Sequence, residues 1–351
     1  DYYNTVAQNN NTAYILFDQV SSVRTNDTRY GLLTKQVLDA KIAANTAPTK
    51  SIATTNTYSA YVSDVLDITN RLNAMASLRI DYFETKGTLN VMTGKYSGAN
   101  PGQLALSPKF GVVYQLVKSK VSVFGNYMNG FRNVAPVTQP LSDISGTFKP
   151  QQANQLEGGI KLDLFNHNLT LTASYYDLLV KDITRSQQYI RGTDTVNITV
   201  QDATQASRGF EFDVAASPVA GLNFIAGYSY NDSKLVKADA TTQGRRPTSA
   251  GPQNLANVWL SYTFLKGSVK GLGVGIGGNY ASENMITSSS LTGYFSLPSY
   301  AVLNASVFYN ANSYRIALKA DNLTDEVYYG GWTTIERNMP RRFALSLAFK
   351  F

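Results

Sequence analysis

The sequence predicts an all-β protein, a transmembrane antiparallel β-barrel, and three observations support this prediction. Segments in which large apolar residues alternate with small or polar ones recur along the chain. No run of roughly 18 apolar residues is present, so helical spans are excluded and only a closed barrel could cross a bilayer. Short and long connections alternate between the segments, which is the layout of bacterial outer-membrane barrels.

The clearest alternating segment is the last one, 341–351. Its odd positions from Phe343 to Phe351 are large and apolar, whereas its even positions from Ala344 to Lys350 are small, polar or charged. A β-strand with this pattern has one apolar face and one polar face. Because a soluble sandwich would have to cover the apolar face, the pattern favours a strand with lipid on one side and a polar lumen on the other.

About fourteen alternating segments are expected as strands, each near the length that crosses a bilayer at a tilt. Within one of them Ile160 and Leu162 alternate with Lys161 and Asp163, which indicates a wet interior, because a packed core would tolerate such charges poorly. The expected strands cover residues 13–23, 56–67, 71–84, 105–117, 119–131, 150–164, 169–182, 206–217, 221–233, 252–264, 270–282, 297–309, 313–324 and 341–351.

The connections between these segments form two classes. Counting back from the carboxyl end, we expect the short ones in the periplasm and the long ones outside the cell. The short turns are Asp67 to Asn70, Val117 to Ser119, Asn166 to Asn168, Pro218 to Ala220, Leu265 to Val269 and Asn310 to Asn312. The long loops are 85–104, 132–149, 183–205, 234–251, 283–296 and 325–340.

The composition agrees with a lipid-facing surface and excludes several kinds of site. Charged residues make up 16% of the chain, against about 25% in an ordinary soluble domain. The net charge of +7 is not gathered into a basic stripe with interleaved aromatics, so nucleic acid is not an expected partner. Cysteine is absent, which excludes disulfides, thiolate metal sites and cysteine nucleophiles.

Two motifs that could suggest an enzyme have simpler explanations. The run 271–278 matches G-x-G-x-x-G, but without a strand–turn–helix context it does not predict a dinucleotide site. Its glycines share one strand face, and we expect bare backbone there, where something could pack closely inside the barrel. His167, the only histidine, is expected in a short turn rather than in a metal site or a catalytic triad. Glu157 and Glu211 are expected to be solvated or ion-paired, so no enzyme and no cofactor are predicted.

The carboxyl-terminal region resembles a known family. Asp321 to Tyr329 reads DNLTDEVYY, Pro340 to Phe343 reads PRRF, and a terminal aromatic strand follows; this combination resembles the carboxyl-terminal signature of TonB-dependent outer-membrane receptors. Upstream matches occur in the order of the family and are most similar to its ferric-siderophore branch. They are SPKFGVVY at 107–114 with Tyr127 and 130–132, KPQ at 149–151 with EGGIK at 157–161 and YYD at 175–177, SRGFE at 207–211 with 221–222 and YSY at 228–230, and Arg246-Pro247 with Pro252 and Asn257.

The resemblance implies a fold and a function. Members of the family have an amino-terminal plug that engages the energy transducer TonB, followed by a barrel of about 22 strands. Residues 1–351 are therefore expected to be the carboxyl-terminal portion of such a barrel, without the plug. The implied function is import of a ferric siderophore across the outer membrane of a Gram-negative bacterium, with the iron carried inside the ligand and with outer-membrane lipid and lipopolysaccharide as surroundings.

Three alternatives to this function stay open at this stage. The first is a TonB-dependent importer of another substrate, such as haem, cobalamin or a glycan. The second is a passive outer-membrane pore whose barrel of about fourteen strands is complete as given. The third is a surface adhesin built from stacked sandwiches, which would be soluble without detergent.

Ligand recognition is expected on the long loops, because short turns offer no surface. Aromatic faces and guanidinium groups suit the bulky, partly aromatic and often anionic shell that a siderophore forms around iron. The alternative for each such residue is an aromatic girdle or a cation that pairs with lipopolysaccharide. The candidate ligand-binding residues are Tyr189 with Arg191, Arg245 with Arg246, Tyr294 with Phe295, and Trp332 with Arg337.

Overall fold

The computed structural model describes residues 2–9, 49–97, 102–331 and 334–349. The strands are β1 Tyr2–Asn9, β2 Thr49–Asp67, β3 Leu72–Asn90, β4 Lys95–Ser97, β5 Gly102–Val117, β6 Val121–Arg132, β7 Gln151–Leu164, β8 Leu169–Arg191, β9 Asp194–Ala216, β10 Leu222–Lys237, β11 Asn254–Thr263, β12 Leu272–Ala281, β13 Asn284–Ser289, β14 Gly293–Leu297, β15 Tyr300–Asn310, β16 Tyr314–Asp321, β17 Tyr329–Gly330, β18 Glu336–Arg337 and β19 Arg342–Phe349. A single 3₁₀ turn, Thr248–Ala250, is the helical element in this part of the chain. No helix among the described residues is long and apolar enough to span a membrane.

The all-β, antiparallel fold is confirmed. The main sheet has the order β1-β2-β3-β5-β6-β7-β8-β9-β10-β11-β12-β15-β16-β19, with β4 paired to β3, and its neighbours follow one another along the chain. Thirteen of the expected strands coincide with strands of this sheet, within a few residues at most ends. The strand expected at 13–23 lies outside the described residues. The order ends at β1 and β19, so the closing pair expected between the last strand and the first is not among the described strand pairs.

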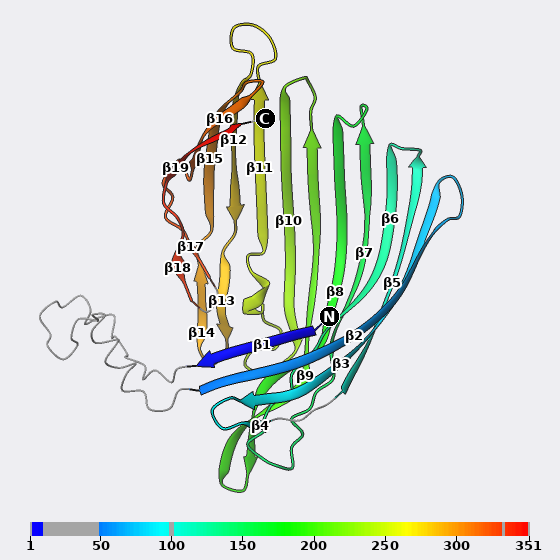
Figure 1. Ribbon diagram of the computed structural model, residues 1–351, viewed down its shortest axis with the longest axis vertical. Helices are drawn as coiled ribbons and strands as arrows, with labels where there is room; N and C mark the ends of the chain where they lie inside the picture. The colour runs from blue at the N-terminus through cyan, green and yellow to red at the C-terminus, as the bar shows by residue number, and fades with distance from the viewer. Residues whose placement is uncertain (1, 10–48, 98–101, 332–333, 350–351) are drawn as a thin grey trace, which may run out of the picture. The chain divides into compact units, whose positions relative to one another are not determined.

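The chain divides into two compact units. The first contains the described parts of 1–59, 81–104 and 133–148, and in it the buried side chain of Gln103 donates from Nε2 to the carbonyl oxygens of Val134 (2.9 Å) and Phe148 (2.7 Å). The second contains 60–80, 105–132 and the described residues of 149–351, and thus most of the strands. Figure 1 shows β7 to β12 of this second unit side by side, with their short turns at the top and their long connections below.

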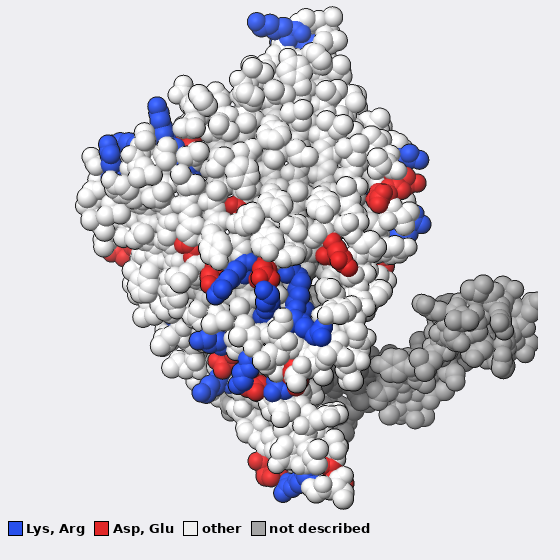
Figure 2. Space-filling model, turned by 180° about the vertical axis from the view of Figure 1, so that it is seen from behind, with Lys and Arg blue, Asp and Glu red and all other residues white. Residues whose placement is uncertain are grey.

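The register of the second unit confirms that the sheet has one apolar face. Leu171 of β8 lies opposite Leu162 of β7 on one side and Val214 of β9 on the other. The same face ends at Leu345 and Leu347 of β19, and Leu345 is 74% exposed. Large apolar side chains at such exposure would destabilise a soluble protein, so this face is the one that contacts lipid. Figure 2 shows a broad surface without charged side chains above a group of charged ones.

The opposite face is polar, as the alternation predicts. Glu157 lies opposite Asn126 and Tyr176, and Glu211 lies opposite Ser174 and Ser229. Neighbouring strands therefore bring their charged and hydroxyl residues to a common side, away from lipid. Oε2 of Glu157 accepts a hydrogen bond from Gln155 Nε2 at 3.3 Å and lies 3.5 Å from Asn126 Nδ2, so this carboxylate has polar neighbours on that side.

The prediction of bare backbone along 271–278 is wrong. An added Cβ on Gly275 would lie 2.5 Å from Cζ2 of Trp259, and one on Gly277 would lie 2.6 Å from Cε3 of the same ring. The ring of Phe308 occupies the corresponding space over Gly273. The glycines thus make room for aromatic side chains from the neighbouring strands β11 and β15, and these rings cover the polar face of β12. The alternation within one strand shows which face has no side chains of its own. It does not show which side chains of the adjacent strands cover that face.

The short turns are confirmed, and two long loops are corrected. Within the loop expected at 85–104, β3 continues to Asn90 and pairs with β4, Lys95–Ser97. His167 lies in the turn between β7 and β8, at φ 68°, with Nδ1 2.7 Å from Oδ2 of Asp163. The loop expected at 183–205 is instead a continuation of β8 and β9, which meet in a tight turn at Gly192 with φ 63°. The apolar alternation stops in this region because both faces are wet beyond the lipid, whereas the backbone hydrogen bonds between the strands continue.

Candidate functional site

Two long connections fold against each other and carry four of the eight candidate residues, Arg245, Arg246, Tyr294 and Phe295. Connection 238–253 joins β10 to β11, and connection 282–299 contains the hairpin β13–β14. Ser290 N donates to the carbonyl oxygen of Thr241 (2.9 Å), and Thr248 Oγ1 donates to that of Ile286 (2.9 Å). Each of these bonds has a backbone carbonyl oxygen as its acceptor, so the two connections hold each other's backbone in a defined conformation.

Arg245 and Tyr294 meet on this surface. Nη1 of Arg245 donates to the hydroxyl oxygen of Tyr294 at 2.6 Å, and Cζ lies 5.1 Å from the centre of the tyrosine ring. Tyr294 is 71% exposed and the adjacent Phe295 is 51% exposed. A guanidinium held beside exposed aromatic rings can donate charge-assisted hydrogen bonds while the rings stack on a flat ligand. The structure therefore brings together two of the predicted residues, Arg245 and Tyr294, although they come from connections about 50 residues apart.

Arg246 has a different environment from its neighbour Arg245. Its Nη1 donates to the carbonyl oxygen of Asn231 (2.8 Å), and its Nε and Nη2 donate to that of Gly251 (3.1 and 3.0 Å). Burial lowers the pKa of Arg246, and the charge of Asp232 opposes this shift. In this structure the guanidinium attaches connection 238–253 to β10, and a role in contacting ligand stays a prediction.

A second arginine links the extended β8–β9 hairpin to the same connection. Arg185 of β8 forms a two-point contact with Asp202 of β9, from Nε to Oδ1 (2.7 Å) and from Nη2 to Oδ2 (3.0 Å). Its Nη1 donates to Asp239, which lies in connection 238–253. The sequence analysis did not identify this cluster, because the three residues are far apart in the chain and match no motif spacing.

The other predicted residues lie elsewhere. Tyr189 and Arg191 are near the tip of the β8–β9 hairpin, opposite Val196 and Asp194. Arg337 is in β18, opposite Tyr329 of β17. Trp332 lies outside the described residues.

The described residues contain no group of three or more histidine, cysteine, aspartate or glutamate side chains that could hold a metal ion. The arrangement around Arg245 is suited to noncovalent recognition rather than to chemistry on a substrate, because it has aromatic faces and hydrogen-bond donors.

Comparison with known proteins identifies the family. The family model described as TonB dependent receptor-like, beta-barrel, matches residues 1–323. The metal-pseudopaline receptor CntO of Pseudomonas aeruginosa is 24% identical over 301 residues, which are 83% of this chain and 40% of that protein. The ferrichrome outer membrane transporter/phage receptor of Escherichia coli K12 is 26% identical over 296 residues, 83% of this chain and 37% of that protein.

Solved structures agree with this result at the level of the fold. The ferric-catecholate import receptor Fiu from E. coli K12 has a TM-score of 0.69 at 20% identity, covering 86% of this chain and 46% of that one. The siderophore receptor PiuA from Acinetobacter baumannii has a TM-score of 0.69 at 21% identity, covering 87% and 44%. The chain spans about two fifths of the length of the curated relatives CntO and the ferrichrome transporter. Since the family model covers most of the sequence and the fold agrees, the chain belongs to the TonB-dependent receptors of the Gram-negative outer membrane, as a portion of their β-barrel.

Proposed function

We propose that this chain forms part of the barrel of an outer-membrane receptor that binds an iron–siderophore complex and imports it with energy supplied through TonB. The observation that carries the proposal is that matched relatives are named for such ligands, among them ferrichrome and ferric pyoverdine. The iron arrives inside the ligand as cargo, so the protein needs no resident metal site.

The surface around Arg245 supports this proposal. The guanidinium and the Tyr294 ring offer a cation and an exposed aromatic face at one place, and the next residue along the strand, Phe295, is a second exposed aromatic residue. An anionic, partly aromatic shell around iron would gain charge-assisted hydrogen bonds from the first and stacking from the other two. Passive pores have no need of such a preorganised cation at the end of the sheet.

The partners proposed for the apolar face are outer-membrane lipid and lipopolysaccharide. The ring centre of Phe210 lies 5.7 Å from that of Tyr228 and 5.3 Å from that of Tyr230. These three rings are at the long-connection end of the apolar face. Two residues from Phe210 in β9, toward the long connections, Arg208 lies opposite Asp177 of β8 and Asp232 of β10. Aromatic residues of this kind mark the edge of the hydrocarbon. Arg208 would then lie at the depth of lipopolysaccharide phosphates.

Uptake of radiolabelled iron tests the function. A strain lacking the gene is complemented with the full-length receptor and supplied with ⁵⁵Fe-loaded siderophores of the hydroxamate, catecholate and mixed types. We expect uptake of at least one of them, abolished by a protonophore or by deletion of tonB, because import against a gradient needs energy. Competition with haem, cobalamin and glycans tests whether the receptor binds one of these substrates instead of a ferric siderophore.

Two results would contradict the proposal. Uptake that is insensitive to both the protonophore and the tonB deletion would favour a passive pore. Energy-dependent uptake of haem, cobalamin or a glycan, without uptake of any ferric siderophore, would assign another substrate. The control is the amount of folded receptor in the outer membrane, measured by heat-modifiable migration in gel electrophoresis.

A further inference from the structure

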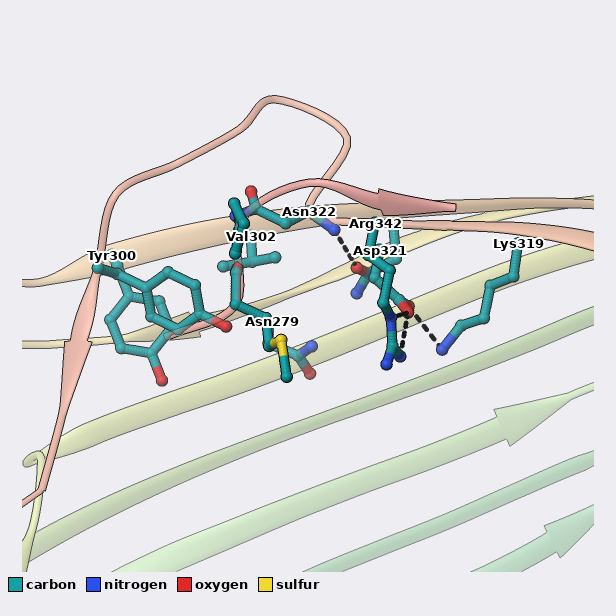
Figure 3. A pocket seen from close by; sticks show the side chains of 11 residues that line it. Asn279, Tyr300, Val302, Lys319, Asp321, Asn322 and Arg342 are labelled. Carbon is teal, nitrogen blue, oxygen red and sulfur yellow. Dashed lines mark hydrogen bonds and ion pairs between the residues drawn. The ribbon is translucent and has the colours of Figure 1, made fainter. Parts of the chain in front are cut away.

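A cavity of about 430 Å³ lies at the long-connection ends of β15, β16 and β19, and it shares no residue with the Arg245–Tyr294 surface. Its floor is formed by the polar face of the sheet, where Asn279 of β12 lies opposite Val302 of β15. Its cover comes from the connection that follows β16 and includes Asn322, Tyr328 and Met339. Figure 3 shows these side chains around the cavity.

The charged wall of the cavity has two cations and one carboxylate. Asp321 accepts a bond from Lys319 Nζ at 2.6 Å through Oδ1, and bonds from Arg342 Nη2 at 2.8 Å and Nε at 3.3 Å through Oδ2. These contacts, drawn as dashed lines in Figure 3, leave the wall with a net charge of +1. They also fix both cations while leaving the Nη1 hydrogens of Arg342 and two Nζ hydrogens of Lys319 for a ligand.

Two side-chain amides line the cavity: that of Asn304 supplies a hydrogen-bond donor of defined orientation, and that of Asn322 holds the covering connection in place. Asn304 accepts a bond through Oδ1 from the backbone nitrogen of Asn322 at 3.0 Å, which leaves its Nδ2 as the end that can donate into the cavity. The side chain of Asn322 is committed to the covering connection, with Nδ2 donating to the carbonyl oxygen of Glu326 (2.9 Å) and Oδ1 accepting from the nitrogen of Glu326 (2.8 Å).

An aromatic wall completes the cavity. The rings of Tyr300 and Tyr328 lie with their centres 4.4 Å apart, and both line the cavity. The planes of the two phenol rings are tilted by 39°, so the rings pack against each other and form an apolar wall beside the charged one. A ligand with one negative group and a flat or apolar body would contact both walls at once.

We infer that this cavity is a binding site for a small carboxylate, recognised by Arg342, Lys319 and Asn304. A planar guanidinium held at one edge by Asp321 matches the two oxygens of a carboxylate. The net charge of +1 is balanced by a single carboxylate, whereas a doubly charged phosphate would leave an excess negative charge beside Asp321. The carboxylate can come from a free small molecule or from an acidic side chain of a polypeptide segment on the polar face of the sheet.

The test uses 4-fluorobenzoate as probe and ¹⁹F NMR line broadening as readout, with the receptor purified in detergent. 4-Fluorobenzamide, which is the uncharged isostere, measures partitioning into the micelle. We expect saturable binding of the benzoate and at least a tenfold loss of affinity, about 1.4 kcal/mol, in Arg342→Gln and in Lys319→Gln. Lys234→Gln is the matched control, since Lys234 also pairs with a carboxylate, Asp232, at 2.8 Å but does not line the cavity.

Competition distinguishes the sources of the carboxylate. Displacement of the probe by free benzoate or acetate supports a small-molecule ligand. Displacement only by a capped glutamate peptide supports an acidic polypeptide segment, with the same recognition chemistry. Phosphate displacing the probe more effectively than carboxylates would overturn the assignment, as would equal binding in the wild type and in both cavity variants, or no saturable binding at all. Iron uptake is measured separately, so failure of the proposed transport leaves this result unaffected.

Discussion

At the scale of single residues, adjacent arginines have different surroundings and should have different functions. Arg245 reaches an exposed tyrosine on another connection, whereas Arg246 is turned inward to backbone oxygens of Asn231 and Gly251. Removing a partly buried guanidinium leaves its acceptors without partners, which costs stability, whereas removing an exposed one costs little. Binding and stability can therefore be separated by substituting the two positions one at a time.

Arg245→Ala should lower affinity for the proposed ferric-siderophore ligand at least tenfold, about 1.4 kcal/mol, because that ligand would lose a charge-assisted hydrogen bond. Trp332→Ala belongs to the same test. Arg246→Ala should instead lower the denaturation temperature. Binding is measured by fluorescence quenching, with Lys266→Ala on the short-turn side as control. Wild-type affinity in both Arg245→Ala and Trp332→Ala would remove the ligand site from these loops.

A second prediction at the scale of single residues concerns Gly275. Its missing side chain makes room for Trp259, so Gly275→Ala should destabilise the protein by about 1–3 kcal/mol through overpacking. Trp259→Ala should reduce that cost, and a double-mutant cycle on denaturant unfolding measures the coupling. Gly125→Ala is the control, since the nearest atom to its added Cβ, the Glu157 carbonyl oxygen, is 3.9 Å away. Additive effects of the two substitutions would mean that the ring does not fill this space.

At the scale of the element, each strand is defined by two faces in different solvents. The apolar side chains of β7 align with those of β8 and β9, and the charged ones align on the opposite side. A shift of one residue in register would exchange the faces and place charges in lipid, so the lipid itself fixes the register. The extension of β8 and β9 beyond the lipid has no such constraint, and contacts such as Arg185 with Asp202 and Asp239 hold it instead.

Arginine substitutions on the two faces should have unequal costs. Leu347→Arg places a charge in lipid and should destabilise the protein by about 2–4 kcal/mol near the bilayer midplane. Leu162→Arg should behave similarly, because Leu162 aligns with Leu171 on the same face. Asp163→Arg on the polar face should cost little, since it removes only an exposed contact with His167. The measurement is reversible unfolding in lipid vesicles, and equal costs on both faces would show that the register is wrong.

At the scale of the whole molecule, the last strand has an edge that must be satisfied. β19 pairs with β16 through the register Tyr314↔Phe349 to Asp321↔Arg342. An open strand edge in lipid leaves backbone groups without hydrogen bonds, which is costly. Among the described strands β19 has one partner, β16, so its other edge is expected to pair with a further strand in an assembled barrel.

Deletion of Phe351, or Phe351→Asp, should reduce the amount of folded receptor in the outer membrane. Both Phe351 and Lys350 lie outside the described residues, but in the sequence Phe351 is the last of the alternating apolar positions that begin at Phe343, and removing it should weaken the lipid-facing pattern. Heat-modifiable migration in gel electrophoresis measures the folded fraction, and Lys350→Gln, at a polar position of the same alternation, is the control. Unchanged levels in both Phe351 variants would contradict the assignment of this strand as the closing one.

The class of fold, most of the strands and the two faces could be predicted from the sequence, because alternation is a local property that a lipid-facing strand must have. The sequence also predicted the short turns, whereas a ligand-binding role for Arg245 and Tyr294 stays a prediction. Tertiary structure decided which of these residues meet, since contacts across about 50 residues have no local pattern. It also decided that Trp259 covers Gly275, that Arg185 links the extended hairpin to connection 238–253, and that Lys319 and Arg342 share Asp321. Each of these depends on register between strands, which follows from packing and lipid contact over the whole sheet rather than from any single segment.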